Sequence, residues 1–266
     1  MSIRDTGRAS HVALGSVLGL VYAGCVPSAG ILIIGNEILS GKVVDTNSAY
    51  LCRELRGLGV DVERVVTILD DVDTIASEVK AMSSAYDFVF TSGGVGPTHD
   101  DVTMEGVAAA FGVGVELSES IAGRIRRAAG REPNESQLKM AQIPTGATLL
   151  DAGDSWVPLV VMENVYIFPG IPELLRRKFE SVRERFRGVP FALSRVYVKR
   201  YESDIAESLH ALLHEFPELL LGSYPRMGEK SYRVLLTLES RDASYLERAL
   251  NSLLERLPED AVHRVE

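Results

Sequence analysis

Short apolar runs alternate with amphipathic segments through the first half of the chain. The apolar runs predict buried strands, at Ile31–Ile34, Val60–Leu69 and Phe88–Phe90. The segments between and after them carry apolar residues at helical spacing, which predicts helices over Asn47–Leu58, Val72–Met82 and Val102–Phe111. Strand and helix in strict alternation indicate a mostly parallel sheet that is covered by helices on both faces.

The pattern continues with less regular elements. Further helices are predicted at Ser118–Ala129, Glu135–Ala141 and Glu173–Arg187, and short strands at Val157–Val161 and Val165–Phe168. Three consecutive basic residues, Arg176, Arg177 and Lys178, are interpreted as a solvated face of the last helix.

After Gly188 the order of elements changes to βαββαβ, the split arrangement of ferredoxin-like modules. The six predicted elements are Ser194–Arg200, Ile205–Glu215, Leu219–Ser223, Tyr232–Glu239, Tyr245–Leu257 and Ala261–Val265. We therefore predict a nucleotide domain over residues 29–188 and a small α+β domain over residues 189–266.

Residues 1–28 do not fit this pattern. The stretch from His11 to Pro27 is largely apolar and follows Arg4 and Arg8, as in a targeting segment. We interpret residues 1–28 as a tail, with a presequence as the alternative. Only two cysteines occur, which indicates a reducing compartment, so a cytoplasmic protein is expected, or a mitochondrial one if the segment is a presequence.

The charge balance excludes some partners. With 28 Lys and Arg against 37 Asp and Glu, the formal net charge is −9. A nucleic-acid-binding protein usually carries a basic footprint, so no nucleic-acid partner is expected. No membrane partner is expected either, because no apolar segment reaches convincing membrane-spanning length.

The segment from Gly93 to Asp101 carries the strongest chemical signal. Gly93, Gly94 and Gly96 follow a buried strand and precede a helix, where bare backbone N–H groups and a helix N-terminus favour an anion. Asp100 and Asp101 come directly afterwards and would repel a phosphate. A divalent cation removes that conflict, because Mg²⁺-like ions are held by one or two carboxylates plus phosphate oxygens.

A second polar segment follows the first strand. It contains Gly35, Glu37 and Gly41, and is read either as a turn or as part of a site. Asp45 is suited to cap the next helix, which starts at Asn47, but it is also expected at the same sheet edge as the glycines.

The carboxylates after the glycines also have a purely structural alternative. Asp101 or Thr103 could cap the next helix, with Glu105 in its first turn. A helix cap needs only one such residue, so we favour the interpretation that this segment binds a metal ion and a phosphate.

These segments resemble the molybdopterin-binding-domain superfamily, which includes the N-terminal part of competence/damage-inducible protein A. The resemblance is carried by Gly-Asn-Glu-Ile-Leu-Ser-Gly at 35–41, Asp-Thr-Asn at 45–47 and Gly-Gly-Val-Gly-Pro-Thr-His-Asp-Asp at 93–101. With Asn164–Arg177, Gly222–Pro225 and Val234–Leu238, the chain looks most similar to the N-terminal molybdopterin-binding-like domain of eukaryotic FAD synthase.

The resemblance implies a three-layer Rossmann-like domain and metal-dependent pyrophosphate hydrolysis. The implied substrate is FAD, cleaved to FMN and AMP, or ADP-ribose, and the implied cofactor is Mg²⁺, Mn²⁺ or Co²⁺. Asp45, Asp100 and Asp101 become the candidate catalytic and metal-binding residues. The candidate substrate-binding residues are Gly35, Glu37, Asn47, Gly93, Gly94, Gly96, Pro97, Thr98, Thr103 and Glu105.

The sequence departs from the superfamily in two ways that bear on the expected activity and ligand. The sequence has no second catalytic domain of the kind that adenylates FMN, so FAD synthesis is not expected of it unless it belongs to a longer protein. Val95 stands where the molybdopterin enzymes typically carry threonine. The alternatives are a molybdopterin or nucleotide-binding module without turnover and a molybdopterin adenylyltransferase-like enzyme acting on a pterin nucleotide. A homo-oligomer is expected, with the ferredoxin-like module as a dimerisation element or substrate lid.

Overall fold

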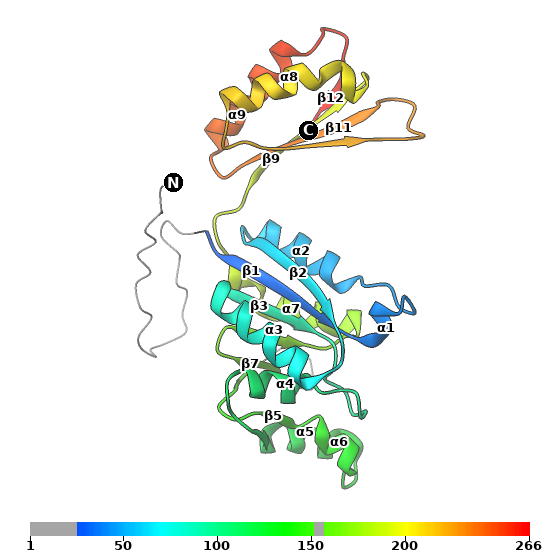
Figure 1. Cartoon of the computed structure of the whole chain (residues 1–266), viewed down its shortest axis with the longest axis vertical. Coiled ribbons are helices and arrows are strands. Elements are labelled where there is room, and N and C mark those ends of the chain that lie inside the picture. The colour runs from blue at the N-terminus through cyan, green and yellow to red at the C-terminus, as the bar shows by residue number, and fades with distance from the viewer. Residues whose placement is uncertain (1–25, 152–156) are drawn as a thin grey trace.

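A six-stranded sheet organises the first of two lobes in the computed structural model, which describes residues 26–151 and 157–266 (Figure 1). The strand order is β2-β1-β3-β8-β7-β6. The strands are β1 (Ser28–Ile34), β2 (Asp61–Ile68), β3 (Phe88–Ser92), β6 (Thr148–Leu150), β7 (Leu159–Met162) and β8 (Val165–Phe168). The first four in the order are parallel, and β7 is antiparallel to both of its neighbours.

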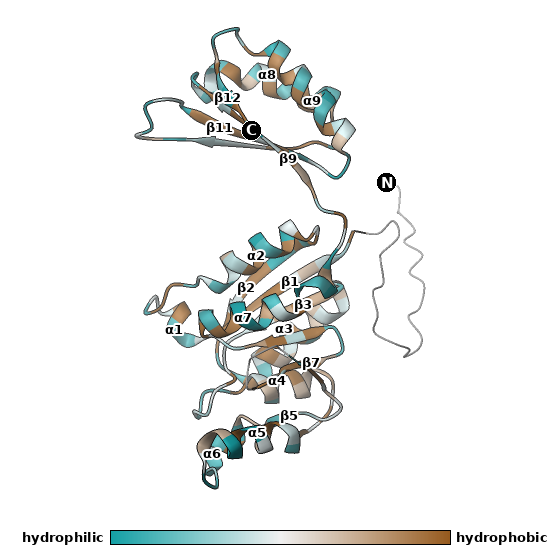
Figure 2. Ribbon diagram, turned by 180° about the vertical axis from the view of Figure 1, so that it is seen from behind, coloured by the Kyte–Doolittle hydropathy of each residue, from teal (hydrophilic) through white to brown (hydrophobic). Residues whose placement is uncertain are grey.

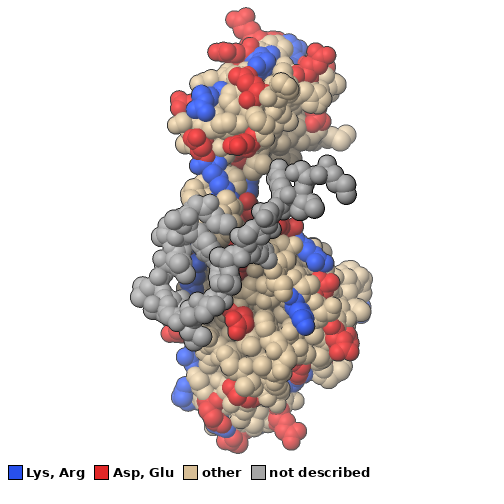
Figure 3. All heavy atoms as spheres, turned by 60° about the vertical axis from the view of Figure 1, so that its left-hand side comes forward, with Lys and Arg blue, Asp and Glu red and all other residues tan. Residues whose placement is uncertain are grey.

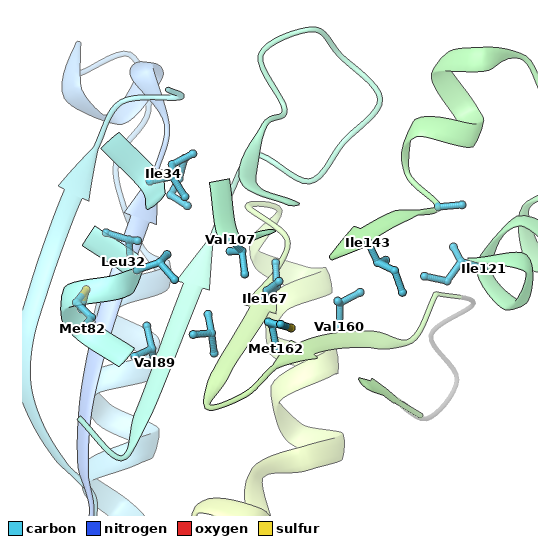
Figure 4. Close-up of a cluster of buried hydrophobic side chains, with 14 of the residues drawn as sticks. Leu32, Ile34, Met82, Val89, Val107, Ile121, Ile143, Val160, Met162 and Ile167 are labelled. Carbon is cyan, nitrogen blue, oxygen red and sulfur yellow. The ribbon is translucent and has the colours of Figure 1, made fainter. Parts of the chain in front are cut away.

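Helices cover both faces of this sheet and make a three-layer domain. They are α1 (Asn36–Leu39), α2 (Asn47–Gly57), α3 (Val72–Ala85), α4 (Thr103–Ala110), α5 (Glu119–Ala129), α6 (Glu135–Lys139) and α7 (Pro172–Val182). Side chains alternate across a strand, so Ile31 and Ile33 pack on α2 and α7, whereas Leu32 and Ile34 pack on the side of α3, α4 and α5. Figure 4 shows the second of these cores, and Figure 2 shows the apolar residues between the layers.

The second lobe is an antiparallel sheet of order β10-β11-β9-β12 with two helices. Its elements are β9 (Ala192–Val198), α8 (Glu202–Glu215), β10 (Leu220–Pro225), β11 (Val234–Ser240), α9 (Ala243–Arg256) and β12 (Val262–Val265). Alternate residues of β11, including Leu236 and Leu238, are buried in one core with residues of α8 and α9. The expected fold class, a mostly parallel three-layer domain plus a small ferredoxin-like α+β module, is confirmed.

A cluster of charged and aromatic side chains joins the two lobes. The guanidinium carbons of Arg56 and Arg241 lie 3.4 Å and 3.9 Å from the ring centre of Phe191, just before β9. Arg56 forms an ion pair with Glu239 at 2.8 Å, and Arg241 with Asp61 at 3.0 Å. On the face seen in Figure 3, the described residues carry acidic and basic side chains interspersed over both lobes.

The structure differs from the predictions in local details. The Gly35–Gly41 segment, interpreted as either a turn or part of a site, contains the short helix α1. The helix predicted to Arg187 ends at Val182 and continues as the 3₁₀ helix η1 (Arg183–Phe186). Three strands of three residues each were not predicted, namely β4 (Val115–Leu117), β5 (Gln142–Pro144) and β6.

The predicted targeting segment largely lies outside the described residues, which begin at Val26. Among the described residues, none of the helices combines the length and the apolar character that crossing a bilayer requires.

Candidate functional site

The carboxyl ends of three parallel strands meet at one edge of the sheet. In the strand register, Ile33 lies opposite Ser92, and Ser92 lies opposite Phe168. The buried Asn47 at the start of α2 ties this edge together, because its Nδ2 donates to Ser92 Oγ at 2.9 Å and to the carbonyl oxygen of Gly170 at 2.7 Å. Asn47 therefore fixes the loops after β3 and β8 relative to each other.

The turn after β3 requires glycine at two positions. Gly93 has a φ of +114°, and a Cβ there would lie 2.0 Å from the carbonyl oxygen of Ile34. Gly94 has a φ of +64°, and a Cβ there would lie 2.3 Å from Oγ1 of Thr103. The backbone can thus adopt these positive-φ conformations close to β1 and α4 only without side chains at the two positions.

Thr103, the first residue of α4, orients the turn of residues Gly93–Gly96, called the glycine turn below. Its Oγ1 donates to the carbonyl oxygen of Gly93 at 2.9 Å, and its N–H donates to the carbonyl oxygen of Gly94 at 3.0 Å. In a trans peptide the N–H points opposite to the C=O, so the N–H groups of Gly94 and Val95 point away from Thr103. No acceptor for the N–H groups of Gly94, Val95 and Gly96 is found among the described residues. Three free donors in one turn are suited to bind an anion.

Asp101 is held beside this turn and does not cap α4. Its Oδ2 accepts hydrogen bonds from the N–H of Thr98, at 2.8 Å, and from the Thr98 hydroxyl. Lys139 Nζ donates to the carbonyl oxygen of Thr98 at 2.7 Å and so fastens the same loop from α6. The N-cap position of α4 is Val102, which makes no side-chain cap, so the capping alternative for Asp101 and Thr103 is excluded.

Asp45, in contrast, does act as a cap. Its Oδ1 accepts the N–H groups of Asn47 at 2.9 Å and of Ser48 at 3.0 Å, and its Oδ2 accepts the Ser48 hydroxyl. These bonds satisfy orphan N–H groups of the first turn of α2. Asp45 does not line the cavity described below.

Four carboxylates share this edge: Glu37, Asp70, Asp100 and Asp101. Burial raises the pKa of Asp70, and the negative charges of Glu37, Asp100 and Asp101 raise it further, against the lowering effect of the hydrogen bond from the N–H of Asn36. Asp70 is not among the predicted site residues, although it follows the end of β2 and therefore lies at the same edge of the sheet. Among residues 26–151 and 157–266, no three His, Cys, Asp or Glu side chains already form a metal-binding cluster.

A cavity of about 610 Å³ opens beside the glycine turn. Its polar edge is formed by Glu37, Gly93, Gly94, Gly96, Pro97 and Asp101. Most of its other lining residues are apolar and include Val95, Met104, Ile121, Met140, Val160, Ile167, Ile171 and Leu174. A largely apolar cavity with a few converging polar groups is typical of a small-molecule site.

Lys178 also lines this cavity, which corrects its interpretation as part of a solvated face. Arg176 and Arg177 are exposed, but Lys178 is only 7% exposed. Its Nζ donates to the carbonyl oxygens of Val157 at 2.5 Å and of Pro158 at 3.1 Å. Burial, and after it the positive charge of Arg124, lowers the pKa of Lys178 to about 8. Its spacing from Leu175, on the core face of α7, was the signal in the sequence that could have revealed it.

The other predicted residues surround the cavity without lining it. Thr103 and Asn47 are buried supports, and Gly35 lies behind Glu37. Glu105 lies with Lys139 and Gln142 around a smaller depression next to Asp101. Thr98 and Asp100 are exposed in the loop that carries Asp101.

Residues 30–187 match the model of the probable molybdopterin binding domain. The chain belongs to this molybdopterin-binding-domain family. Residues 190–266 match the middle domain of FAD synthase.

The chain is similar in sequence to relatives of different lengths. A protein of Archaeoglobus fulgidus is 34% identical over 227 residues, covering 85% of this chain and 96% of that protein. A probable FAD synthase of Caenorhabditis elegans is 33% identical over 258 residues, covering 86% of this chain but 50% of that protein. The chain therefore spans about half the length of the nematode relative.

Bacterial and archaeal CinA proteins are similar as well. A CinA-like protein of Thermotoga maritima is 29% identical, covering 87% of this chain and 59% of that protein. The crystal structure of CinA from Thermoplasma acidophilum superposes with a TM-score of 0.57 and 30% identity, covering 60% of this chain and 98% of that one.

The close approach of Gly93 to β1 predicts a large loss of stability in Gly93→Ala. The new Cβ would meet the Ile34 carbonyl at 2.0 Å in a positive-φ conformation, so the free energy of unfolding should fall by about 3 kcal/mol or more. Gly112→Ala is the matched control, because Gly112 has a φ of +69° with nothing within 4 Å, and should cost about 1–2 kcal/mol. Urea unfolding of both variants measures the difference, and equal losses would contradict the argument.

The burial of Lys178 predicts a pH-dependent stability. Its folded pKa of about 8 lies below its usual value, so the unfolded state binds more protons between the two values. The loss of stability caused by burying the charged Lys178 is therefore fully present below pH 8, and it is relieved as the pH rises above 8. Relative to Lys178→Met, the wild-type free energy of unfolding should increase from pH 8 to pH 10. Urea unfolding at both pH values tests this, and a constant difference would show that the burial of Lys178 carries no such penalty.

Proposed function

We propose that this chain binds a dinucleotide at the glycine turn and hydrolyses its pyrophosphate bond, with FAD or ADP-ribose as the substrate. One observation carries the proposal. A single cavity is lined by the turn Gly94–Gly96, whose N–H groups have no acceptor among the described residues, by Asp101 and by a set of apolar side chains. This arrangement suits a ligand with a phosphate group next to a flat ring system. Relatives named as probable FAD synthase and as CinA-like support a nucleotide ligand.

The carboxylates fit a divalent cation that is completed by the substrate. The described residues offer no cluster of three ready ligands, but Mg²⁺ commonly binds to one or two carboxylates plus substrate phosphates and water. Asp100 and Asp101 would hold it, with Glu37 and Asp70 at the same edge. Asp45 is the weakest member of the proposed set, because both of its oxygens already accept hydrogen bonds from α2. When bound, such an ion neutralises the phosphate charge and lowers the pKa of a bound water.

The residues of the chain itself position the substrate. The N–H groups of Gly94–Gly96 donate to phosphate oxygens and stabilise the negative charge that builds there during the reaction. Thr98 and Lys139 hold the loop of Asp101, while Thr103 and Asn47 keep the turn rigid. In the net reaction, the oxygen of a water molecule bonds to one phosphorus, the bridging P–O bond breaks, and the other phosphate leaves with the electron pair. FAD and water then give FMN and AMP.

A binding module for molybdopterin or a nucleotide, without turnover, is the second candidate. It is favoured by one observation, namely that the cavity is formed although no cluster of three metal-binding residues exists in the described part of the chain. An adenylyltransferase-like reaction would differ from both by consuming ATP in the presence of a pterin substrate.

The proposal predicts metal-dependent release of AMP. The purified chain is incubated with FAD or ADP-ribose and with Mg²⁺, Mn²⁺ or Co²⁺, and AMP is followed by chromatography. We expect AMP from at least one substrate and none after EDTA treatment, because the carboxylate edge repels the pyrophosphate without a cation. Binding of nucleotide with no AMP under any of the three ions would select the binding module instead.

The proposal also predicts that Asp101→Asn lowers the rate of AMP release by roughly 100-fold or more, as for other losses of transition-state charge stabilisation. Asparagine keeps the shape of the side chain but removes the charge. Asp73→Asn, an exposed carboxylate in the first turn of α3, is the matched control and should retain the full rate. Full turnover in Asp101→Asn would show that the site has been assigned to the wrong carboxylate.

A further inference from the structure

Lys178 lines the cavity, yet the proposed hydrolysis does not use it. It lies six residues after Pro172, the first residue of α7, which is roughly 9 Å along the helix axis. The loop before α7 contacts the glycine turn, since a Cβ on Gly170 would lie 3.3 Å from Cα of Gly93. Lys178 therefore marks a part of the cavity that lies away from the phosphate-binding turn.

The ammonium group of Lys178 has hydrogen-bonding capacity left for a ligand. It carries three N–H groups, of which two donate to the carbonyl oxygens of Val157 and Pro158. Within the described ranges, no carboxylate forms an ion pair with it, and the charge that acts on it is the positive charge of Arg124. Burying a lysine that is only 7% exposed, with no counter-ion among the described residues, costs free energy, and a ligand that accepts the third hydrogen bond of its ammonium group would offset that cost.

The wall between the two ends specifies the shape of the ligand. Met104, Ile167, Ile171 and Leu174 line the same cavity as the glycine turn and Lys178. An apolar lining of this kind takes a flat ring system, and among the described lining residues Lys178 offers that ring a hydrogen-bond donor. The matching ring therefore carries a hydrogen-bond acceptor at its far edge.

We propose that Lys178 is a specificity-determining residue that donates a hydrogen bond to a carbonyl oxygen on the pyrimidine ring of a flavin or pterin. Isoalloxazine and pterin rings both carry such an oxygen. Adenine carries no carbonyl oxygen, and the hydrogen-bond acceptors of its ring are nitrogens. The flavin end of FAD therefore occupies this cavity, and FAD is preferred over ADP-ribose. This inference rests on the proposed function only in placing the phosphates at the glycine turn.

Binding measurements with Lys178→Met test the inference. Methionine has a similar length and no donor, and Arg176→Met on the exposed face of the same helix is the matched control. FMN and riboflavin are titrated by quenching of flavin fluorescence, and neopterin and ADP-ribose by calorimetry. Loss of a hydrogen bond from a charged donor should raise the Kd for FMN and for riboflavin by about ten- to hundred-fold. The Kd for ADP-ribose should change by less than about two-fold, which also shows that the variant is folded.

The pattern of losses distinguishes the possible roles of Lys178. A weaker Kd for FMN but not for riboflavin would mean that Lys178 binds the phosphate, and equal losses for FMN and ADP-ribose would mean a structural role. Either result, or unchanged flavin binding, overturns the inference. If neopterin and riboflavin both bind more weakly, Lys178 recognises the carbonyl oxygen that pterins and flavins share. If only riboflavin binds more weakly, Lys178 recognises a flavin. Since these are binding measurements, a chain that releases no AMP would contradict the proposed function and leave this inference standing.

Discussion

The close packing of three strand ends is the constraint on which the site depends. β1, β3 and β8 are parallel neighbours in register, so the turns that follow them leave the sheet at one edge. Gly93 passes against the carbonyl of Ile34 at a distance that leaves no space for a Cβ, and a Cβ on Gly170 would be in tight contact, at 3.3 Å, with Cα of Gly93. Thr103 and Asn47 then fix the turn by hydrogen bonds. A larger side chain at Gly93 would push the turn away and remove the three free N–H donors.

Opposite electrostatic preferences meet at this edge. The free N–H groups of the turn favour an anion, whereas the carboxylates of Glu37, Asp70, Asp100 and Asp101 repel one. Burial raises the pKa of Asp70, and the negative charges of the other three carboxylates raise it further. A cation that bridges phosphate and carboxylates satisfies both groups at once. Away from this edge the cavity is apolar and contains a single buried cation, Lys178, among its lining residues. The two parts therefore suit the two parts of a nucleotide, the phosphates and the ring.

Sequence patterns predicted the elements that are long or strongly periodic and the turn from Gly93 to Asp101, because strand-helix alternation and glycine spacing are local signals. They did not predict β6, which has three residues and is defined by pairing with β7. Lys178 was assigned to the surface because its basic neighbours were read as a run, although its helical position places it with Leu175 and Phe179. The capping role of Asp45 is also a local signal, a short polar side chain just before a predicted helix, and the hydrogen bonds from Asn47 and Ser48 confirm it. The place of Asp70 beside the other carboxylates depends on which strand ends lie together, and this follows only from tertiary structure.

The crystal structure of this chain soaked with FAD and Mn²⁺ is the most direct test of the central claim, that the edge of the sheet is a phosphate site next to a ring site. We expect the pyrophosphate within hydrogen-bonding distance of the N–H groups of Gly94–Gly96 and an anomalous manganese peak between phosphate and Asp101. The flavin should lie against Met104 and Leu174. A ligand bound at any other place, or a pyrophosphate at the turn with no metal beside Asp101, would contradict the account.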